Sequence, residues 1–280
     1  MEQRSILAAY AHPDDEAFGS GGTLAKYAQS GAQVTLVCAT RGEVGEISDP
    51  ALATPENLGQ VREQEMLNAA QALGVSDVRF LDYRDSGMAG TDDNHNPAAF
   101  VNVPAEEVVE RLVRIIREVR PQVVVTFDPN GGYGHPDHIA IHQHTVAAFH
   151  LAGDPERYPE AGPVWQPARL FYNAIPRSTF LAMRDRLVAA GEDTSMFDRI
   201  EENGMGWPDD QIQAQLDVSG TVGAKWQSLM AHRTQFGENN MFRRFPEDEV
   251  QRMMSQEHFV LAWPQPTEGF KLSDLFEGVA

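Results

Sequence analysis

The sequence contains one cysteine, Cys38, and no apolar stretch near the roughly 18 residues of a membrane-spanning helix. A single thiol cannot form an intrachain disulfide, so nothing in the sequence requires an oxidising compartment. The N-terminal apolar run is interrupted early by His and Asp, unlike a signal peptide. Basic residues are also scarce, since 22 Lys and Arg stand against 41 Asp and Glu, giving a formal net charge of −19. Because such a surface repels phosphate backbones and anionic membranes, we expect a cytoplasmic protein that binds neither nucleic acid nor membranes.

Apolar periodicity predicts alternating strands and helices over the first half of the chain. Hydrophobic residues make up 42% of the 280 residues, which is enough to bury a sizeable core. The predicted strands cover residues 5–11, 34–39, 78–81 and 123–127, and the predicted helices cover 17–30, 56–73, 104–119 and 136–151. Alternation of this kind is typical of an α/β fold with a Rossmann-like, mostly parallel sheet and helices on both faces.

The second half of the chain has a mixed pattern. Residues 152–166 are rich in Gly, Pro and Asp, which indicates a boundary. We therefore predict a catalytic α/β domain over residues 1–165. We also predict a smaller α+β part over residues 166–280 that completes the substrate pocket. The elements expected in it are strands 170–174, 212–218 and 259–263 and helices 176–190 and 223–232.

Two similar polar segments each follow a predicted strand directly. Residues 12–16 (HPDDE) follow the first strand, and residues 131–138 (GGYGHPDH) follow the fourth. Ligands of open α/β sheets bind beyond the carboxyl ends of the strands. Both segments lie at such ends, so we expect them to converge.

Histidine and carboxylate side chains are typical ligands of a catalytic zinc ion, which keeps three protein ligands and one open position. His12 and Asp15 are three residues apart on a turn that enters a helix, so they can point the same way. His138 can supply the third ligand from the other segment. Asp14 is then free to accept a proton from water on the metal, and His135 is free to act as a proton donor.

The alternative is that His-Pro-Asp is merely a turn or a helix cap, because Asp caps helices and Pro starts them. For residues 12–14 alone, the capping interpretation and the metal-binding interpretation have about equal support from the sequence. A second His-Pro-Asp after another buried strand makes coincidence much less plausible. Some of these residues can cap their helices while also serving a metal.

The two motifs together resemble those of the LmbE-like (PIG-L) family of zinc-dependent N-deacetylases. The family pattern Ala-His-Pro-Asp-Asp-Glu is present as Ala11 to Glu16, and His-Pro-Asp-His as His135 to His138. Within the family, the sequence is most similar to the mycothiol-pathway branch of N-acetylglucosaminyl-inositol deacetylases and S-conjugate amidases. The stretches that support this likeness are residues 40–43, 83–90, 100–102 and 127–138. The likeness covers the first 150 residues well and is thin beyond them, where it rests on Lys225 and residues 231–235.

The resemblance implies a role for each matching residue. The implied roles are zinc ligands His12, Asp15 and His138; general base Asp14; general acid and oxyanion donor His135, with its orienting partner Asp137; oxyanion assistance from Tyr133; and sugar contacts by Arg62 and Asp85. Two of these have ordinary alternatives. Arg62 could be a surface helix residue paired with Glu65 or Glu56, and Asp85 could simply form a turn.

The implied activity is hydrolysis of the N-acetyl group of a GlcNAc-containing small molecule, GlcNAc-inositol or similar, to acetate and a free amine. The implied cofactor is one Zn²⁺ per chain, with Fe²⁺ as an alternative ion. Two other functions stay open: an amidase acting on thiol S-conjugates, and a sugar-binding protein without turnover. A homo-oligomer is compatible with the sequence. The segment Met241–Phe245 could be a lid, an oligomer contact, a substrate wall or, as we favour, a packed loop.

Overall fold

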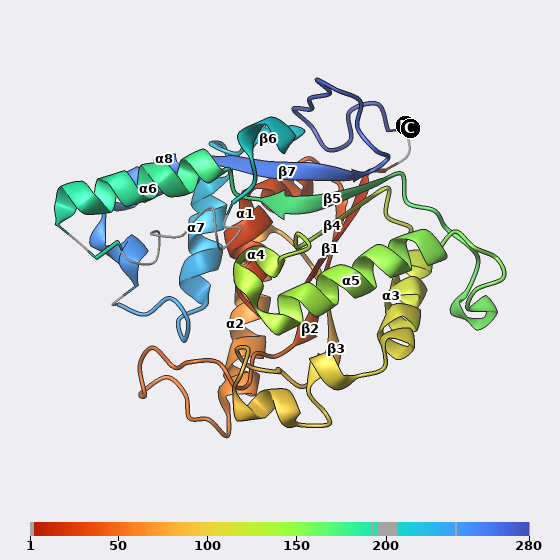
Figure 1. The fold of residues 1–280 in the computed structure, drawn as a ribbon, viewed down its shortest axis with the longest axis horizontal. Coiled ribbons are helices and arrows are strands. Elements are labelled where there is room, and N and C mark those ends of the chain that lie inside the picture. The colour runs from red at the N-terminus through yellow and green to blue at the C-terminus, as the bar shows by residue number, and fades with distance from the viewer. Residues whose placement is uncertain (1–2, 192, 195–205, 239, 280) are drawn as a thin grey trace.

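The computed structural model describes residues 3–191, 193–194, 206–238 and 240–279, which build one seven-stranded sheet with helices packed against it (Figure 1). The strand order is β3-β2-β1-β4-β5-β7-β6. The strands are β1 (Ser5–Tyr10), β2 (Gln33–Thr40), β3 (Asp77–Tyr83), β4 (Val123–Thr126), β5 (Arg169–Ala174), β6 (Ala214–Asp217) and β7 (Gln256–Trp263). The first five strands pair in parallel, and β7 runs antiparallel to both of its neighbours. The predicted mostly parallel α/β fold is therefore confirmed.

Helices cover both faces of the sheet (Figure 1). The helices on one face are α1 (Asp15–Gln29), α2 (Leu58–Leu73) and α7 (Val222–Ala231), and those on the other are α3 (Ala105–Val119) and α5 (Pro136–Leu151). Strand β1 contributes to both cores, because Ile6 and Ala8 face α1 and α2 whereas Leu7 and Ala9 face α3 and α5. A strand that is covered on both faces is apolar throughout, which explains the uninterrupted run at the N-terminus.

The order in which successive strands are added to the sheet reverses at β1: β2 and β3 lie on one side of it, and β4 and β5 lie on the other. The connection through α1 leads from β1 to β2 on one side, whereas β4 pairs with the opposite side of β1. The carboxyl ends of β1 and β4 thus flank the point at which the strand order reverses. In doubly wound sheets this is the place where ligands bind. The two His-Pro-Asp segments follow these two strands.

Strands from both halves of the chain share the sheet, since β4 pairs with β5. The division into parts 1–165 and 166–280 stays a prediction. The remaining helices are α4 (Gly131–Gly134), α6 (Arg177–Ala190) and α8 (Glu247–Met253), of which α4 and α8 have no counterpart among the predicted elements. Among the described residues, no helix combines the length and the apolar character that a membrane span requires.

The segment Met241–Phe245 contains a short 3-10 helix, Met241–Arg244. Phe242 is 9% exposed and packs in a cluster with Leu229, Phe236 and Val250. Its ring also lies 5.8 Å from that of Phe18 on α1. Packing of this kind agrees with the loop interpretation that we favoured.

Candidate active site

The two His-Pro-Asp segments meet beyond the carboxyl ends of β1 and β4, as their positions in the sequence predict. His12 Nδ1 lies 3.2 Å from His138 Nε2, although 126 residues separate them. Asp15 joins this pair, with Oδ1 3.3 Å from His138 Nε2 and Oδ2 3.7 Å from His12 Nδ1. Both histidines are at most 6% exposed. Three potential metal donors from two loops therefore converge in a buried place.

The hydrogen bonds of the two imidazole rings show which nitrogens are free to bind a metal. The Nδ1–H of His138 donates to the carbonyl oxygen of Gly131 at 3.0 Å, which leaves Nε2 without a proton. The Nε2–H of His12 donates to Asp137 Oδ2 at 3.2 Å, so Nδ1 is the nitrogen that faces His138. Burial lowers the pKa of His12, but hydrogen bonds to Asp137 and Asp85 outweigh it and hold this pKa well above its usual range, so the place between these groups favours a positive charge, which a metal ion would supply. The donor set fits a divalent metal ion.

Close packing also fixes the ring of His138. Gly131 has a φ of 61°, in the left-handed region that glycine tolerates best. A Cβ at this position would lie 2.7 Å from the Cβ of His138. The glycine therefore allows its carbonyl oxygen to approach the histidine that it orients.

A second set of three residues, all of them histidines, is also close enough together to hold an ion. Nitrogens of His12, His135 and His138 lie within 4.8 Å of one another, and all three residues are buried. His12, Asp85 and Asp137 form a further such group on the other side of the His12 ring. The geometry thus supports a metal site centred on His12. The choice of Asp15 rather than His135 as the third ligand stays a prediction.

Asp14 lies at the start of α1 in an unusual backbone conformation, with φ 120° and ψ −27°. Its side chain makes no capping hydrogen bond to the helix, so for this motif the simple capping interpretation does not hold. Its Oδ2 lies 3.5 Å from Arg62 Nη2. Desolvation raises the pKa of Asp14 to about 6, and the Arg62 charge opposes this rise. A carboxylate of this kind is ionised at neutral pH and is more basic than usual, as a general base requires.

His135 has a different protonation state from the one that we expected. Its Nδ1 accepts the backbone N–H of Asp137 at 3.1 Å, which caps α5 and leaves any ring proton on Nε2. Burial lowers the pKa of His135 to about 3, although the nearby carboxylates of Asp137 and Asp85 oppose this shift. The ring is therefore a neutral donor in this site rather than an imidazolium ion.

Asp137 also has a different partner from the expected one. The side chain is 0% exposed, and its Oδ2 accepts hydrogen bonds from His12 Nε2 and from the Ser86 N–H, the latter at 2.9 Å. Only its backbone amide contacts His135. The carboxylate thus orients the predicted metal ligand His12.

The two predicted sugar contacts are both buried, and both form hydrogen bonds with the backbone. Arg62 is 4% exposed, and it donates to the carbonyl oxygens of Pro13 at 2.6 Å and Gly42 at 2.9 Å. The alternative in which Arg62 is a surface residue paired with Glu65 or Glu56 is wrong. Asp85 is 2% exposed and accepts the N–H groups of Gly87 and Val44.

Tyr133 is an exposed residue beside two of the histidines of the site. Its side chain is 64% exposed, and its ring centroid is 5.0 Å from that of His138 and 6.3 Å from that of His135. The role of Tyr133 at the oxyanion stays a prediction, as do the sugar contacts of Arg62 and Asp85.

Two buried residues beside the site were given no role from the sequence. Glu16 Oε2 accepts the backbone N–H of Asp14 at 3.0 Å, and Glu16 Oε1 accepts from His232 Nε2 at 2.8 Å. Glu16 is the last residue of the first motif. His232 belongs to residues 231–235, where the resemblance to the family is weak. The motif itself could have drawn attention to Glu16, but nothing local in the sequence connects it to His232.

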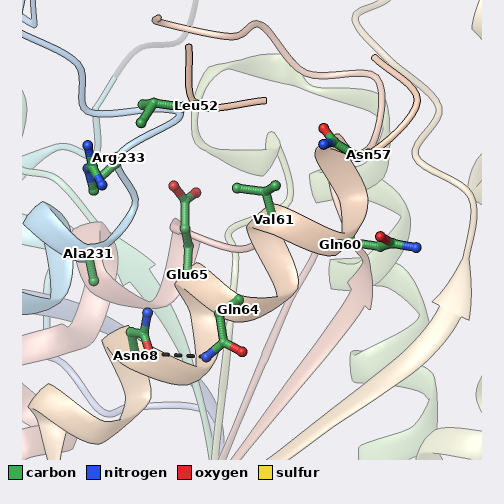
Figure 2. Close-up of a pocket in the computed structure, with 9 residues that line it drawn as sticks. All are labelled: Leu52, Asn57, Gln60, Val61, Gln64, Glu65, Asn68, Ala231 and Arg233. Carbon is green, nitrogen blue, oxygen red and sulfur yellow. Dashed lines mark hydrogen bonds between the residues drawn. The ribbon is translucent and has the colours of Figure 1, made fainter. Parts of the chain in front are cut away.

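A pocket on the flank of α2 lies apart from this cluster (Figure 2). It is lined by Leu52, Asn57, Gln60, Val61, Gln64, Glu65, Asn68, Ala231 and Arg233. None of the predicted ligands or catalytic groups is among these residues. The pocket therefore adds nothing to the metal site, although it shows the segment after α7 running beside α2.

Comparison with known proteins gives the family and close relatives. Residues 7–149 match the family described as PIG-L: GlcNAc-PI de-N-acetylase. A Streptomyces scabiei protein named 1D-myo-inositol 2-acetamido-2-deoxy-alpha-D-glucopyranoside deacetylase is 39% identical over 288 residues, covering 98% of this chain and 89% of that protein. A Rhodococcus erythropolis protein of the same name is 41% identical over 272 residues, covering 92% of this chain and 91% of the relative.

Solved structures of lower identity share the fold. N,N'-diacetylchitobiose deacetylase from Pyrococcus horikoshii aligns with a TM-score of 0.65 and 20% identity, covering 93% of this chain and 84% of the other. The 4-carboxy-2-hydroxymuconate hydratase GalB from Pseudomonas putida aligns with a TM-score of 0.61 and 19% identity, covering 96% and 100%. Because a deacetylase and a hydratase both adopt this fold, the reaction has to be argued from the residues of the site.

Proposed function

The chain belongs to the PIG-L family and is an N-deacetylase, and we propose that its substrate is a GlcNAc unit α-linked to inositol. Relatives that are 39% and 41% identical over nearly the whole chain carry that substrate in their names. The products would be acetate and a free amino sugar. The observation that carries the chemistry is the meeting of His12, Asp15 and His138 with Asp14 beside them.

We propose that His12 Nδ1, Asp15 and His138 Nε2 hold one zinc ion. Two imidazole nitrogens and one carboxylate form a common catalytic zinc set, and Fe²⁺ is the alternative ion for the same donors. When bound, the ion polarises the acetamide carbonyl and makes water easier to deprotonate. The rings of both histidines are fixed by acceptors on their other nitrogens, so the donors are oriented in advance.

One side chain transfers protons in this proposal, and a second stabilises the oxyanion. The carboxylate of Asp14 takes a proton from the attacking water and then returns it to the nitrogen of the departing amine. The Nε2–H of His135 donates a hydrogen bond to the oxygen that becomes negative as the carbonyl is attacked. This assignment replaces the protonated His135 of the sequence-based expectation, because Nδ1 of that ring accepts a hydrogen bond. One C–O bond forms, one C–N bond breaks, and the proton count balances.

The test is amine release from a panel of purified substrates, with zinc added back after chelation. We expect turnover of GlcNAc-inositol and much weaker turnover of simple N-acetylated sugars. Amine release only from thiol S-conjugates would instead show an amidase, and binding of GlcNAc-inositol without amine release would show a non-catalytic sugar-binding protein.

The variant Asp14→Asn tests the base. Its rate should fall by about 10²–10⁴-fold, the usual effect of losing a general base, and its metal content should remain that of the wild type. Asp248→Asn, on an exposed part of α8, is the control for an Asp-to-Asn change far from the site. A wild-type rate for Asp14→Asn would remove this carboxylate from the mechanism. Loss of the metal would show that Asp14 is a ligand.

A further inference from the structure

A buried chain of hydrogen bonds connects the C-terminal part of the protein to Asp14. His232 Nε2 lies 2.8 Å from Glu16 Oε1, and both side chains are fully buried. The other oxygen of the same carboxylate, Glu16 Oε2, accepts the backbone N–H of Asp14 at 3.0 Å. A carboxylate only accepts, so the ring of His232 must donate from Nε2.

Asp14 needs such support because its backbone conformation is strained. A φ of 120° lies in the region that non-glycine residues rarely adopt. Strain of this kind persists only where surrounding contacts hold the backbone in place. The N–H of Asp14 is held by Glu16, and the carbonyl oxygen of the preceding Pro13 is held by Arg62.

His232 is itself held firmly at the end of α7. The segment that follows it is tied to α2, since Thr234 donates to Glu65 from its N–H at 2.8 Å and from its hydroxyl at 2.6 Å. The backbone N–H of Phe236 also donates to the carbonyl oxygen of His232 at 2.7 Å. Figure 2 shows Glu65 on α2 facing the segment that follows α7. The ring of His232 is therefore a fixed donor rather than a mobile one.

We propose that His232 is a positioning residue for the deacetylation, acting through Glu16 to hold Asp14 where it can take the proton. This inference rests on the proposed function of Asp14 as the general base. None of the described hydrogen bonds or ion pairs of His232 reaches a proposed metal ligand or a proposed sugar contact, so its effect should fall on the rate of the chemical step rather than on substrate affinity.

The test compares two amide variants of similar polarity. In His232→Gln the amide nitrogen occupies a place similar to that of Nε2 and can still donate to Glu16. In His232→Asn the shorter side chain places its nitrogen near the position of Nδ1, which has no hydrogen-bond partner in the described structure. Both variants remove the imidazole ring, but only His232→Asn also removes the hydrogen bond to Glu16, so comparing them separates the two effects. His150→Asn, at the exposed end of α5, is the control for a His-to-Asn change far from this contact.

We expect His232→Asn to lower kcat by about 10- to 100-fold with KM within about twofold, because small displacements of a catalytic group have effects of this size. His232→Gln and His150→Asn should stay within about threefold of the wild-type kcat. The visible spectrum of the Co²⁺-substituted protein should be unchanged in all three variants. Equal losses in the Gln and Asn variants, or a changed Co²⁺ spectrum in the Asn variant, would overturn the proposal.

A structural measurement separates this proposal from the proposed function. Crystal structures should show the contact between Glu16 Oε2 and the Asp14 N–H retained in His232→Gln and lost in His232→Asn. If the wild type released no amine from any substrate, the proposed function would fail, whereas these structures would still show whether His232 positions Asp14. An unchanged Asp14 backbone in His232→Asn would overturn the positioning role.

Discussion

Replacing Asp137 by Asn tests how the carboxylate acts on the proposed metal ligand His12. Both of its hydrogen bonds are accepted by one oxygen, Oδ2, which binds His12 Nε2 at 3.2 Å and the Ser86 N–H at 2.9 Å. The other oxygen, Oδ1, is buried and has no hydrogen-bond partner among the described residues. Asparagine has nearly the same shape, so the change alters charge and donor pattern without opening a cavity.

Either orientation of the new amide is unfavourable. If its oxygen replaces Oδ2, the NH₂ group takes the place of Oδ1 and becomes a buried donor without an acceptor, at a cost of about 1–3 kcal/mol. If the amide is flipped, its NH₂ group faces the N–H of Ser86, and His12 must move its own proton to Nδ1. That proton would occupy the nitrogen that faces His138. Loss of a partner that orients a metal-bound histidine lowers metal affinity by about 10- to 100-fold, equivalent to about 1.4–2.8 kcal/mol.

The assay is competition for Zn²⁺ against a fluorescent chelator at constant pH, with urea unfolding as a check on the fold. Asp85→Asn is the matched control, because Asp85 is equally buried but lies farther from His12 Nε2, at 3.4 Å, and is held by two backbone amides. We expect a smaller loss of affinity in this control. Wild-type zinc affinity in Asp137→Asn would refute the reasoning. A lower kcat at unchanged affinity would show that Asp137 acts through His135 instead.

Three further outcomes follow from the geometry. Asp15→Ala should lose the metal ion whereas His135→Ala retains one ion per chain after dialysis, as measured by elemental analysis; the reverse would select the three-histidine set. Gly42→Ala should destabilise the fold by at least about 2 kcal/mol in urea unfolding, because its φ is 62° and a Cβ would lie 2.2 Å from Arg62 Nη1. An unchanged midpoint would contradict that contact. Burial raises the pKa of the Cys38 thiol, so a thiol reagent should label it only after unfolding, and rapid labelling of the native protein would disprove the buried placement.

The sequence predicted those elements whose boundaries have local signals. The helix expected over residues 136–151 is found as Pro136–Leu151, because proline at the first position starts it. The direction of β7 has no such signal. Whether a strand is parallel or antiparallel depends on the path of the preceding connection, here the long segment between β6 and β7. The short helix α8, with seven residues, is likewise too brief for its periodicity to stand out.

The meeting of the two His-Pro-Asp loops could be predicted because a single rule of sheet topology brings them together. His12 and His138 follow two strands that turned out to be neighbours at the reversal of strand order. The partners of their other ring nitrogens could not be predicted in the same way. Asp137 is two residues after His135 in the sequence and was therefore assigned to it, yet its carboxylate binds His12.

The requirements of metal binding explain which part of the site can be recognised from the amino-acid sequence. A metal accepts few ligand types, so imidazole and carboxylate at fixed places leave a pattern in the sequence. A backbone N–H such as that of Asp14 can donate to any suitably placed acceptor. The acceptor here, Glu16, can in turn accept a second hydrogen bond from a donor on any segment of the chain that lies close enough. Here that donor is His232, 216 residues away. The position of the base thus depends on contacts that only the three-dimensional structure specifies, and variants of His232 and of the metal ligands should therefore affect different steps.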